Sequence, residues 1–307
     1  MDKIERTLGQ LFSGRDFEKE YNTLKEKVLQ YEPIRAFLNE HKDDVTEQLI
    51  NQNLSSLYEF MTQDEQFRAK KETLMPGYAP KLVINGEFIT VTYYPTPEKI
   101  EADKRKSVER RIRSLYMPKQ ILEASLDHFY TDEEERQRAL VEAFDFLEHY
   151  SKDSSERVKG LYIHGNFGTG KSYLLGALAR ELALRGVTTT LVYLPEFMRE
   201  IKQSISDNTV SEKIEFAKET EVLMLDDIGA EAMTAWTRDE VLGAILQFRM
   251  QEELPTFFSS NYNMKQLESH LTFTQNGMEE QLKARRIMER IRFLSKEVQL
   301  EGKNRRK

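Results

Sequence analysis

The chain has 307 residues, room for two domains of ordinary size, and its 45 Lys and Arg against 52 Asp and Glu give a net charge of −7. With 39% hydrophobic and 32% charged residues, the composition is globular and excludes a wholly disordered chain. There is no cysteine, no apolar run approaches the roughly 18 residues of a membrane span, and the amino terminus lacks the apolar stretch of a signal peptide. We therefore expect a cytoplasmic protein without disulfides, thiol chemistry or membrane partners.

The first hundred residues predict helices followed by a hairpin. Apolar residues recur at helical spacing between residues 16 and 60, which predicts three short helices. The apolar runs 82–84 and 88–94 flank Asn85-Gly86, a dipeptide suited to a two-residue turn. Pro95 and Pro97 end the second strand because proline offers no ladder donor. A first domain therefore spans residues 1–97.

The next segment is basic within an acidic chain. Residues 99–113 hold seven basic and three acidic side chains. A solvated helical linker is the more ordinary interpretation of such a run, and a nucleic-acid contact is the alternative. We assign residues 98–135 to a basic linker that leads into the second domain. The acidic run 132–135 opens a predicted helix that reaches residue 150, with an apolar stripe made by Ala139, Leu140, Ala143, Phe144 and Leu147.

Residues 136–307 alternate short β-rich runs with helical ones. The predicted strands are 161–163, 188–193, 222–225 and 256–258, and the predicted helices that follow them are 172–184, 196–205, 238–250 and 264–271. This alternation predicts an α/β fold, a parallel sheet with helices on both faces.

One loop in this region carries a phosphate-binding motif. The run Gly165, Asn166, Phe167, Gly168, Thr169, Gly170, Lys171, Ser172 matches G-x-x-x-x-G-K-[ST] between a predicted strand and a predicted helix. Backbone N–H groups and the helix N-terminus would hold the β-phosphate, Lys171 would reach the β- and γ-phosphates, and Ser172 would ligate Mg²⁺. The motif therefore predicts a nucleoside triphosphate site.

Polar residues at two later strand ends complete this site. Asp226 and Asp227 follow the strand 222–225, and Asn261 follows the strand 256–258. We assign Asp226, with Ser172, to the metal, Asp227 to polarising water, and Asn261 to holding the attacking water. Such residues also occur as caps and turns, and only their place in the series favours the catalytic interpretation. The long interval between Lys171 and Asp226 predicts that their strands are not neighbours.

The carboxyl-terminal stretch is strongly basic, with ten basic and three acidic residues between Lys283 and Lys307. A solvated tail is the ordinary interpretation. Arg286 and Arg290, however, lie one helical turn apart, and a guanidinium offered across a subunit boundary would stabilise transition-state charge. We favour Arg290 as this arginine finger, with Arg286 second.

These residues resemble those of AAA+ ATPases, and among them the chain is similar to bacterial helicase loaders of the DnaC and DnaI type. The stretches that carry the resemblance are LMLDDIGAE at 223–231, WTRDEV at 236–241, LPTFFSSN at 254–261, RIMER at 286–290, GKNRR at 302–306 and, in the front half, 77–83 with Asn85-Gly86. The resemblance implies an AAA+ ATPase domain over residues 136–307 that uses ATP and Mg²⁺. It also implies Arg290 as arginine finger and Arg305 as sensor-2 residue.

The same resemblance implies a function and partners. Residues 1–97 would bind the replicative hexameric DNA helicase, and the protein would help place it on single-stranded DNA during primosome assembly at replication initiation and restart. Contacts with other primosome proteins and self-association through the AAA+ domain are implied as well.

Two departures from the family pattern change the expectations. Some of these loaders carry cysteine-based zinc sites around the stretch matching residues 61–97, and this chain has no cysteine, so we expect no zinc. Asp227 stands where many AAA+ proteins have glutamate, which is one methylene longer. We therefore expect slow hydrolysis, with ATP acting as a switch.

Four other functions stay open. A transposition helper of the IstB type would not need a helicase-docking domain, and a DnaA-like initiator would need a duplex-reading helix-turn-helix, for which we expect no room before Lys307. A small-molecule kinase would need lid arginines after the phosphate loop, where residues 188–206 supply a strand and a helix. A nucleotide-responsive adaptor without useful hydrolysis is compatible with Asp227.

Overall fold

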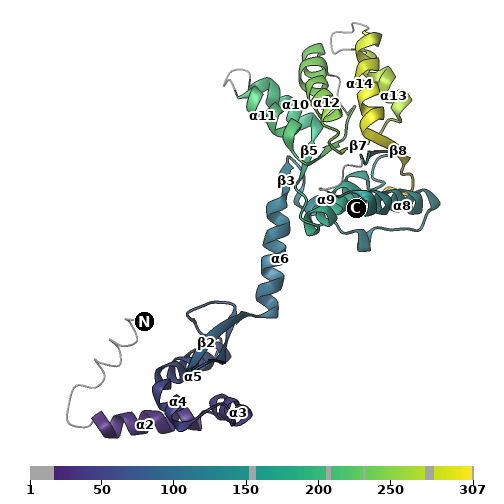
Figure 1. The fold of residues 1–307 in the computed structure, drawn as a ribbon. Helices are drawn as coiled ribbons and strands as arrows, with labels where there is room; N and C mark the ends of the chain where they lie inside the picture. The colour runs from purple at the N-terminus through teal and green to yellow at the C-terminus, as the bar shows by residue number, and fades with distance from the viewer. Residues whose placement is uncertain (1–16, 152–156, 205–208, 231–232, 274–279, 306–307) are drawn as a thin grey trace. The chain divides into compact units, whose positions relative to one another are not determined.

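The computed structural model describes residues 17–151, 157–204, 209–230, 233–273 and 280–305. Its contacts divide the chain into two compact units, Met1–Lys104 and Arg105–Lys307, each of which has its own elements (Figure 1). Among the described residues, none of the helices is both long enough and apolar enough to cross a membrane.

The first unit contains helices and an antiparallel hairpin. Its elements are α2 (Phe17–Gln30), α3 (Glu32–Glu40), α4 (Glu47–Gln52), α5 (Leu54–Arg68), β1 (Tyr78–Asn85) and β2 (Phe88–Pro95). The prediction of three helices is wrong, because the run that ends near Leu57 is broken at Asn53. The Asn53 side chain donates to the carbonyl of Leu49 at 2.8 Å, and its backbone leaves the helical region at φ −113°, ψ 20°. An asparagine that bonds the backbone locally competes with helix continuation.

The predicted hairpin is confirmed, but its turn lies one residue later than predicted. Asn85 pairs with Phe88, so the turn residues are Gly86 and Glu87. Gly86 takes a φ of +60°, which glycine adopts without steric cost. Helix α5 packs against both strands, and the core beneath them is fully buried, with Val28, Ile34, Leu57 and Ile89 at its centre.

Helix α6 (Pro97–Arg111) follows the hairpin and has no buried residue. The chain then forms β3 (Ile112–Leu115), which pairs in parallel with β5 (Thr189–Tyr193) and so belongs to the sheet of the second unit. Sequence patterns alone do not predict this strand, because its sequence, IRSL, has neither an apolar run nor a clear alternation of apolar and polar residues.

The sheet of the second unit has the order β3-β5-β6-β7-β4-β8, and every pairing is parallel. Its other strands are β4 (Gly160–His164), β6 (Val222–Asp226), β7 (Thr256–Ser260) and β8 (Ser295–Gln299). Strand β7 lies between β4 and β6, which confirms that the strands leading to Lys171 and Asp226 are not neighbours. The edge strand β8, SKEVQ, is also absent from the prediction.

Helices cover both faces of this sheet, as predicted (Figure 1). One face carries α7 (Lys119–Leu122), the 3₁₀ turn η1 (Leu126–His128), α8 (Glu134–His149) and α9 (Lys171–Leu184). The other carries α10 (Leu194–Gln203), α11 (Val210–Glu219), the π-helix η2 (Thr237–Leu242), α12 (Gly243–Gln251), α13 (Met264–Thr272) and α14 (Gln281–Leu294). Adjacent strand residues enter opposite cores, as strand geometry requires: Leu161 and Phe257 enter one, Tyr162 and Phe258 the other.

In helix α8, one residue of the predicted apolar stripe is exposed and another phenylalanine is buried in its place. Ala139, Ala143 and Leu147 are buried, but Phe144 is 49% exposed. Phe146 takes the buried position and packs edge-on against Phe257, with ring centroids 4.7 Å apart. A sheet residue far along the chain therefore selects which phenylalanine enters the core.

Candidate nucleotide-binding site

The phosphate loop joins β4 to α9 at the carboxyl end of the strand, where the motif requires it. Gly168 and Gly170 have φ angles of +76° and +98°, in the left-handed region that side chains disfavour. Helix α9 begins at Lys171, so its free N–H groups and its positive end face the loop. The residues from Gly165 to Ser172 thus form an anion cradle.

Lys171 lies at the floor of this cradle and is 7% exposed. Its ammonium donates to the carbonyl oxygens of Gly165 at 2.9 Å and Asn166 at 2.8 Å, and to Asn261 Oδ1 at 2.9 Å. These acceptors hold a buried cation within the loop. A triphosphate would take over part of this coordination, since phosphate oxygens are stronger partners for an ammonium than neutral carbonyls.

The Asp226 carboxylate lies at the end of β6, 5% exposed, and faces the start of α9. It accepts hydrogen bonds from Ser172 Oγ at 2.8 and 2.9 Å and from Ser259 Oγ at 2.5 Å. Burial raises the pKa of Asp226 above its ordinary value, while the bonds from Ser259 and Ser172 oppose the rise. A carboxylate that is this poorly solvated favours a cation beside it.

The residues present fit Mg²⁺ at this position. The Ser172 hydroxyl and the Asp226 carboxylate are hard oxygen donors within hydrogen-bonding distance of each other, which suits a magnesium ion that keeps water and phosphate oxygens as its other ligands. Within the described ranges, no group of three or more His, Asp or Glu side chains could hold a metal ion. The ion would therefore depend on the nucleotide for part of its coordination.

Asp227 and Asn261 meet beside Lys171. Asn261 Nδ2 donates to Asp227 Oδ1 at 3.2 Å while Asn261 Oδ1 accepts from Lys171, so the amide bridges the lysine and the carboxylate. Asp227 has a φ of +63°, a conformation that costs a non-glycine residue energy and that often occurs at functional sites. Its N–H donates to Ser259 Oγ at 3.0 Å. One buried serine thus holds both Asp226 and Asp227.

The carboxyl-terminal residues lie along the phosphate loop. The N–H of Arg305 donates to the carbonyl of Gly168 at 2.9 Å, and Asn304 Oδ1 approaches Gly168 so closely that a Cβ there would lie 2.0 Å from it. The Arg305 guanidinium binds both oxygens of Asp132, at 2.5 and 2.6 Å, and lies over the Tyr130 ring at 4.3 Å. The assigned sensor-2 residue is therefore beside the loop, with its charge directed to Asp132.

Arg136 is a site residue that the sequence patterns miss. It is 1% exposed, donates from Nε to the carbonyl of Tyr130 at 2.7 Å and from Nη1 to the carbonyl of Thr169, and lies over the Phe129 ring at 4.4 Å. Burial lowers the pKa of Arg136. This arginine fastens the phosphate loop to the segment before α8. In the sequence, the run EEERQR shows only that acidic residues precede Arg136, and no local pattern distinguishes Arg136 from the exposed Arg138.

Arg290 is not part of this cluster within its own subunit. It lies on α14 and donates from Nη1 to the carbonyl of Gly243 at 2.8 Å, at the start of α12. Arg286, one turn earlier, is exposed. The predicted site therefore divides into a group that the sheet edge brings together, Lys171, Ser172, Asp226, Asp227 and Asn261, and two arginines on a separate helix.

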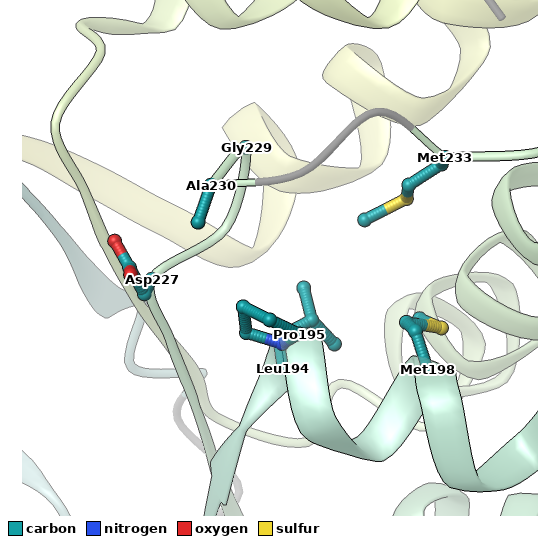
Figure 2. Close-up of a pocket in the computed structure, with 7 residues that line it drawn as sticks. All are labelled: Leu194, Pro195, Met198, Asp227, Gly229, Ala230 and Met233. Carbon is teal, nitrogen blue, oxygen red and sulfur yellow. The ribbon is translucent and has the colours of Figure 1, made fainter. Parts of the chain in front are cut away.

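A small pocket borders Asp227 on the side of α10 (Figure 2). It is a depression with about 140 Å³ of space, part of it continuous with solvent, and is lined by Leu194, Pro195, Met198, Asp227, Gly229, Ala230 and Met233. It is too small for a nucleotide, and no phosphate-loop residue lines it. Its walls are mostly apolar, so it is distinct from the phosphate cradle.

Comparisons with known proteins show which family the chain belongs to. Residues 1–93 match the family model of the primosomal protein DnaI N-terminus, and residues 133–285 match that of the bacterial DnaA ATPase domain. The replicative helicase loader DnaI of Bacillus subtilis (strain 168) is 40% identical over 311 residues, which cover 100% of this chain and 99% of that protein.

Solved structures of helicase loaders also match this chain. A crystal structure of DnaI is 48% identical with a TM-score of 0.58, covering 65% of this chain and 99% of that one. A crystal structure of the DnaC helicase loader is 20% identical with a TM-score of 0.51, covering 60% and 100%, and shares the fold. The full-length match to DnaI, together with the nucleotide-binding geometry of the sheet edge, shows that the chain belongs to the DnaI family of replicative helicase loaders, which has an AAA+ fold.

Proposed function

We propose that this chain is an ATP-dependent loader that binds the replicative hexameric DNA helicase and helps place it on single-stranded DNA during primosome assembly, at initiation and at restart. The observation that carries the proposal is the meeting of Lys171, Ser172, Asp226 and Asn261 at one sheet edge in a chain that matches DnaI over its whole length. Such a protein acts in the cytoplasm, with its DNA.

The residues at the sheet edge have distinct roles in the proposed hydrolysis. The phosphate loop and Lys171 bind the β- and γ-phosphates, and Ser172 and Asp226 hold Mg²⁺, which neutralises phosphate charge when bound. Asn261 and Asp227 share a hydrogen bond at 3.2 Å, and a water that accepted the second N–H of the same amide would lie within reach of the carboxylate. Asp227 then orients this water and accepts its proton.

Arg290 completes the site of a neighbouring subunit. A guanidinium that reaches the γ-phosphate in trans stabilises the charge of the transition state, which is worth roughly 10³–10⁵ in rate in other NTPases. Hydrolysis therefore requires self-association through residues 136–307, while binding of ATP does not. Within its own subunit Arg305 would sense the nucleotide through the phosphate loop, to which its backbone is bonded.

Hydrolysis by the isolated protein is slow in this proposal, so that ATP acts as an assembly switch. Asp227 has a shorter side chain than glutamate, and its carboxylate already accepts a hydrogen bond from Asn261. Rapid turnover by the pure protein, with neither helicase nor DNA present, would contradict this.

Residues 1–97 provide the helicase-docking domain, and residues 98–135 the basic linker and the entry segment, whose strand β3 joins the sheet of the second unit. The test is co-purification of the cognate helicase with the full chain and with residues 1–97 alone, in ATP and in ADP. Retention of the helicase by residues 1–97 supports this division of labour. A Lys171→Ala chain should still bind the helicase but fail to load it, and loading by that variant would refute the ATP-dependent step. Stoichiometric zinc in the purified protein would overturn the expectation that this domain needs no metal.

Helix α6 is the favoured contact for single-stranded DNA. Arg105, Lys106 and Arg110 are exposed and make no hydrogen bond, ion pair or ring contact with any described residue. The basic residues near the carboxyl terminus are instead largely compensated: Lys283 pairs with Asp239 and Glu280, Arg292 with Glu268, Lys296 with Glu142, and Arg305 with Asp132. Unpaired cations on an exposed helix favour phosphate binding, because no internal ion pair has to break.

A further inference from the structure

The contact between Arg290 and Gly243 sets the direction of the guanidinium in the free subunit. Arg290 is half-buried on α14, and one of its N–H groups is used by the Gly243 carbonyl at 2.8 Å. A guanidinium has five N–H donors in a rigid plane, so a single bond to a carbonyl orients the plane and leaves a fork of donors for another acceptor. Burial, and the like charge of Arg286, lower the pKa of Arg290, so its charge is poorly screened at this position.

Gly243 stands where η2 passes into α12, with ordinary helical angles of φ −58° and ψ −43°. Its backbone therefore does not require glycine, and alanine has the higher helix propensity. What the missing side chain permits is close approach. A Cβ at this position would lie 3.2 Å from Arg290 Nη1, 3.3 Å from the Arg238 carbonyl and 3.3 Å from Ile287 Cδ1.

The junction around Gly243 is itself held in place by buried charge. Arg238 is 1% exposed and binds the Asp239 carboxylate at 2.7 and 3.0 Å and Glu280 Oε2 at 2.6 Å. Lys283, in the first turn of α14, binds both of the same carboxylates, at 3.1 and 2.7 Å. The π-helix and the first turn of α14 are thus tied together, about two helical turns before Arg290. Moreover, π-helical turns often occur at functional sites.

We propose that Gly243 is a positioning residue for Arg290: its carbonyl orients the guanidinium in advance, and its lack of a side chain lets the arginine lie against α12 with the remaining donors free for a neighbour's γ-phosphate. This inference rests on the proposed trans role of Arg290. Its energetic basis is that a free arginine loses rotamer entropy when it is immobilised, and Gly243 imposes part of that order before the subunits meet.

The test is Gly243→Ala in the full-length chain, assayed with helicase and single-stranded DNA. We expect kcat for ATP hydrolysis to fall by roughly ten- to a hundredfold, the effect of misplacing a catalytic group by about 1 Å, with KM changed less than about twofold. ATP affinity should be unchanged, and thermal stability should change little, because the better helix propensity of alanine offsets the crowding of its Cβ against the Arg238 carbonyl and Ile287. Asp239→Asn loosens the same junction without adding volume and should lower kcat by a smaller factor. Full activity in both variants would overturn the assignment.

Subunit mixing separates this inference from the proposed function. Lys171→Ala subunits cannot use their own nucleotide site but still offer an intact Arg290, so adding them to Gly243→Ala subunits should restore hydrolysis. Arg290→Ala mixed with Lys171→Ala is the reference for a trans arginine. If the reference recovers and the Gly243→Ala mixture does not, the role of Gly243 is refuted alone. If the reference also fails, or if Arg286→Ala abolishes hydrolysis and Arg290→Ala does not, the trans role of Arg290 is refuted and the inference with it.

Discussion

Ser259 offers a sharp test of the metal site, because an equally buried neighbour serves as its control. The Ser259 hydroxyl, 1% exposed, donates to Asp226 Oδ1 at 2.5 Å and accepts from the N–H of Asp227 at 3.0 Å. The Ser260 hydroxyl, fully buried, bonds neutral groups, among them the carbonyl of Ile228 at 2.6 Å and the N–H of Tyr262 at 3.1 Å. Ser259→Ala and Ser260→Ala therefore remove similar groups with different electrostatic consequences.

The expected magnitude follows from the charge on Asp226. A hydrogen bond to a charged group contributes about 1.5–3 kcal/mol, whereas a neutral one contributes about 0.5–1.5 kcal/mol. When Ser172 turns to Mg²⁺, Ser259 remains as the donor that orients the Asp226 carboxylate, and removing such a partner of a metal ligand costs roughly ten- to a hundredfold in affinity. At about 1.4 kcal/mol per factor of ten, the two estimates agree.

The assay is Mg²⁺-dependent binding of a non-hydrolysable ATP analogue, with thermal unfolding measured in parallel. We expect Ser259→Ala to weaken Mg²⁺-dependent binding by about ten- to a hundredfold and Ser260→Ala by less than about threefold. Both should unfold a few degrees earlier, by roughly 2–8 °C for a loss of about 1–2 kcal/mol. Equal loss of nucleotide affinity in the two variants would refute the reasoning, since the effect would then be general loosening of β7.

Three further predictions follow from the described contacts. Burial raises the pKa of Asp226, so the folded metal-free protein binds a proton there more tightly than the unfolded chain does, and the ionised carboxylate destabilises the fold at neutral pH. Asp226→Asn should therefore raise the unfolding temperature at about pH 7.5, and this gain should shrink as the pH falls below the raised pKa. Scanning fluorimetry at several pH values would measure both effects. Replacing Arg105, Lys106 and Arg110 by glutamine should reduce the salt slope of single-stranded DNA binding by roughly 2, at about 0.7 per lost phosphate contact, and an unchanged slope in a titration from low to high salt would exclude α6. Arg136→Met should weaken ATP binding by about tenfold and lower the free energy of unfolding by roughly 2–4 kcal/mol, because the Thr169 and Tyr130 carbonyls lose their hydrogen-bond donor. Calorimetry would measure both quantities, and an unchanged value of either would contradict the prediction.

Local sequence was enough to predict the phosphate loop and the strand ends that face it. Periodicity and short motifs are properties of neighbouring residues, so Lys171, Ser172, Asp226 and Asn261 could be assigned before their distances were known. The structure brings these four together, within 2.9 Å for each of two pairs, because parallel strands deliver their carboxyl ends to one edge. The long interval before Asp226 likewise predicted that β4 and β6 are not neighbours, and β7 separates them.

Other features depend on contacts between residues far apart in the chain. Strands β3 and β8 lack a clear strand pattern in their sequences, and they pair with the edges that β5 and β4 offer. Ser259 and Arg136 looked like any serine or arginine, and their importance comes from Asp226 and from the Thr169 carbonyl, which folding places beside them.

The sequence by itself determined which side chains could bind a triphosphate, and the order of the helices and strands that carry them. Only the tertiary structure decided which buried groups hold those side chains and where Arg290 is directed, through the carbonyl of Gly243. The reason is physical: helix and strand periods and loop motifs arise from neighbouring residues, whereas a hydrogen bond to a distant carbonyl depends on how packed elements approach each other.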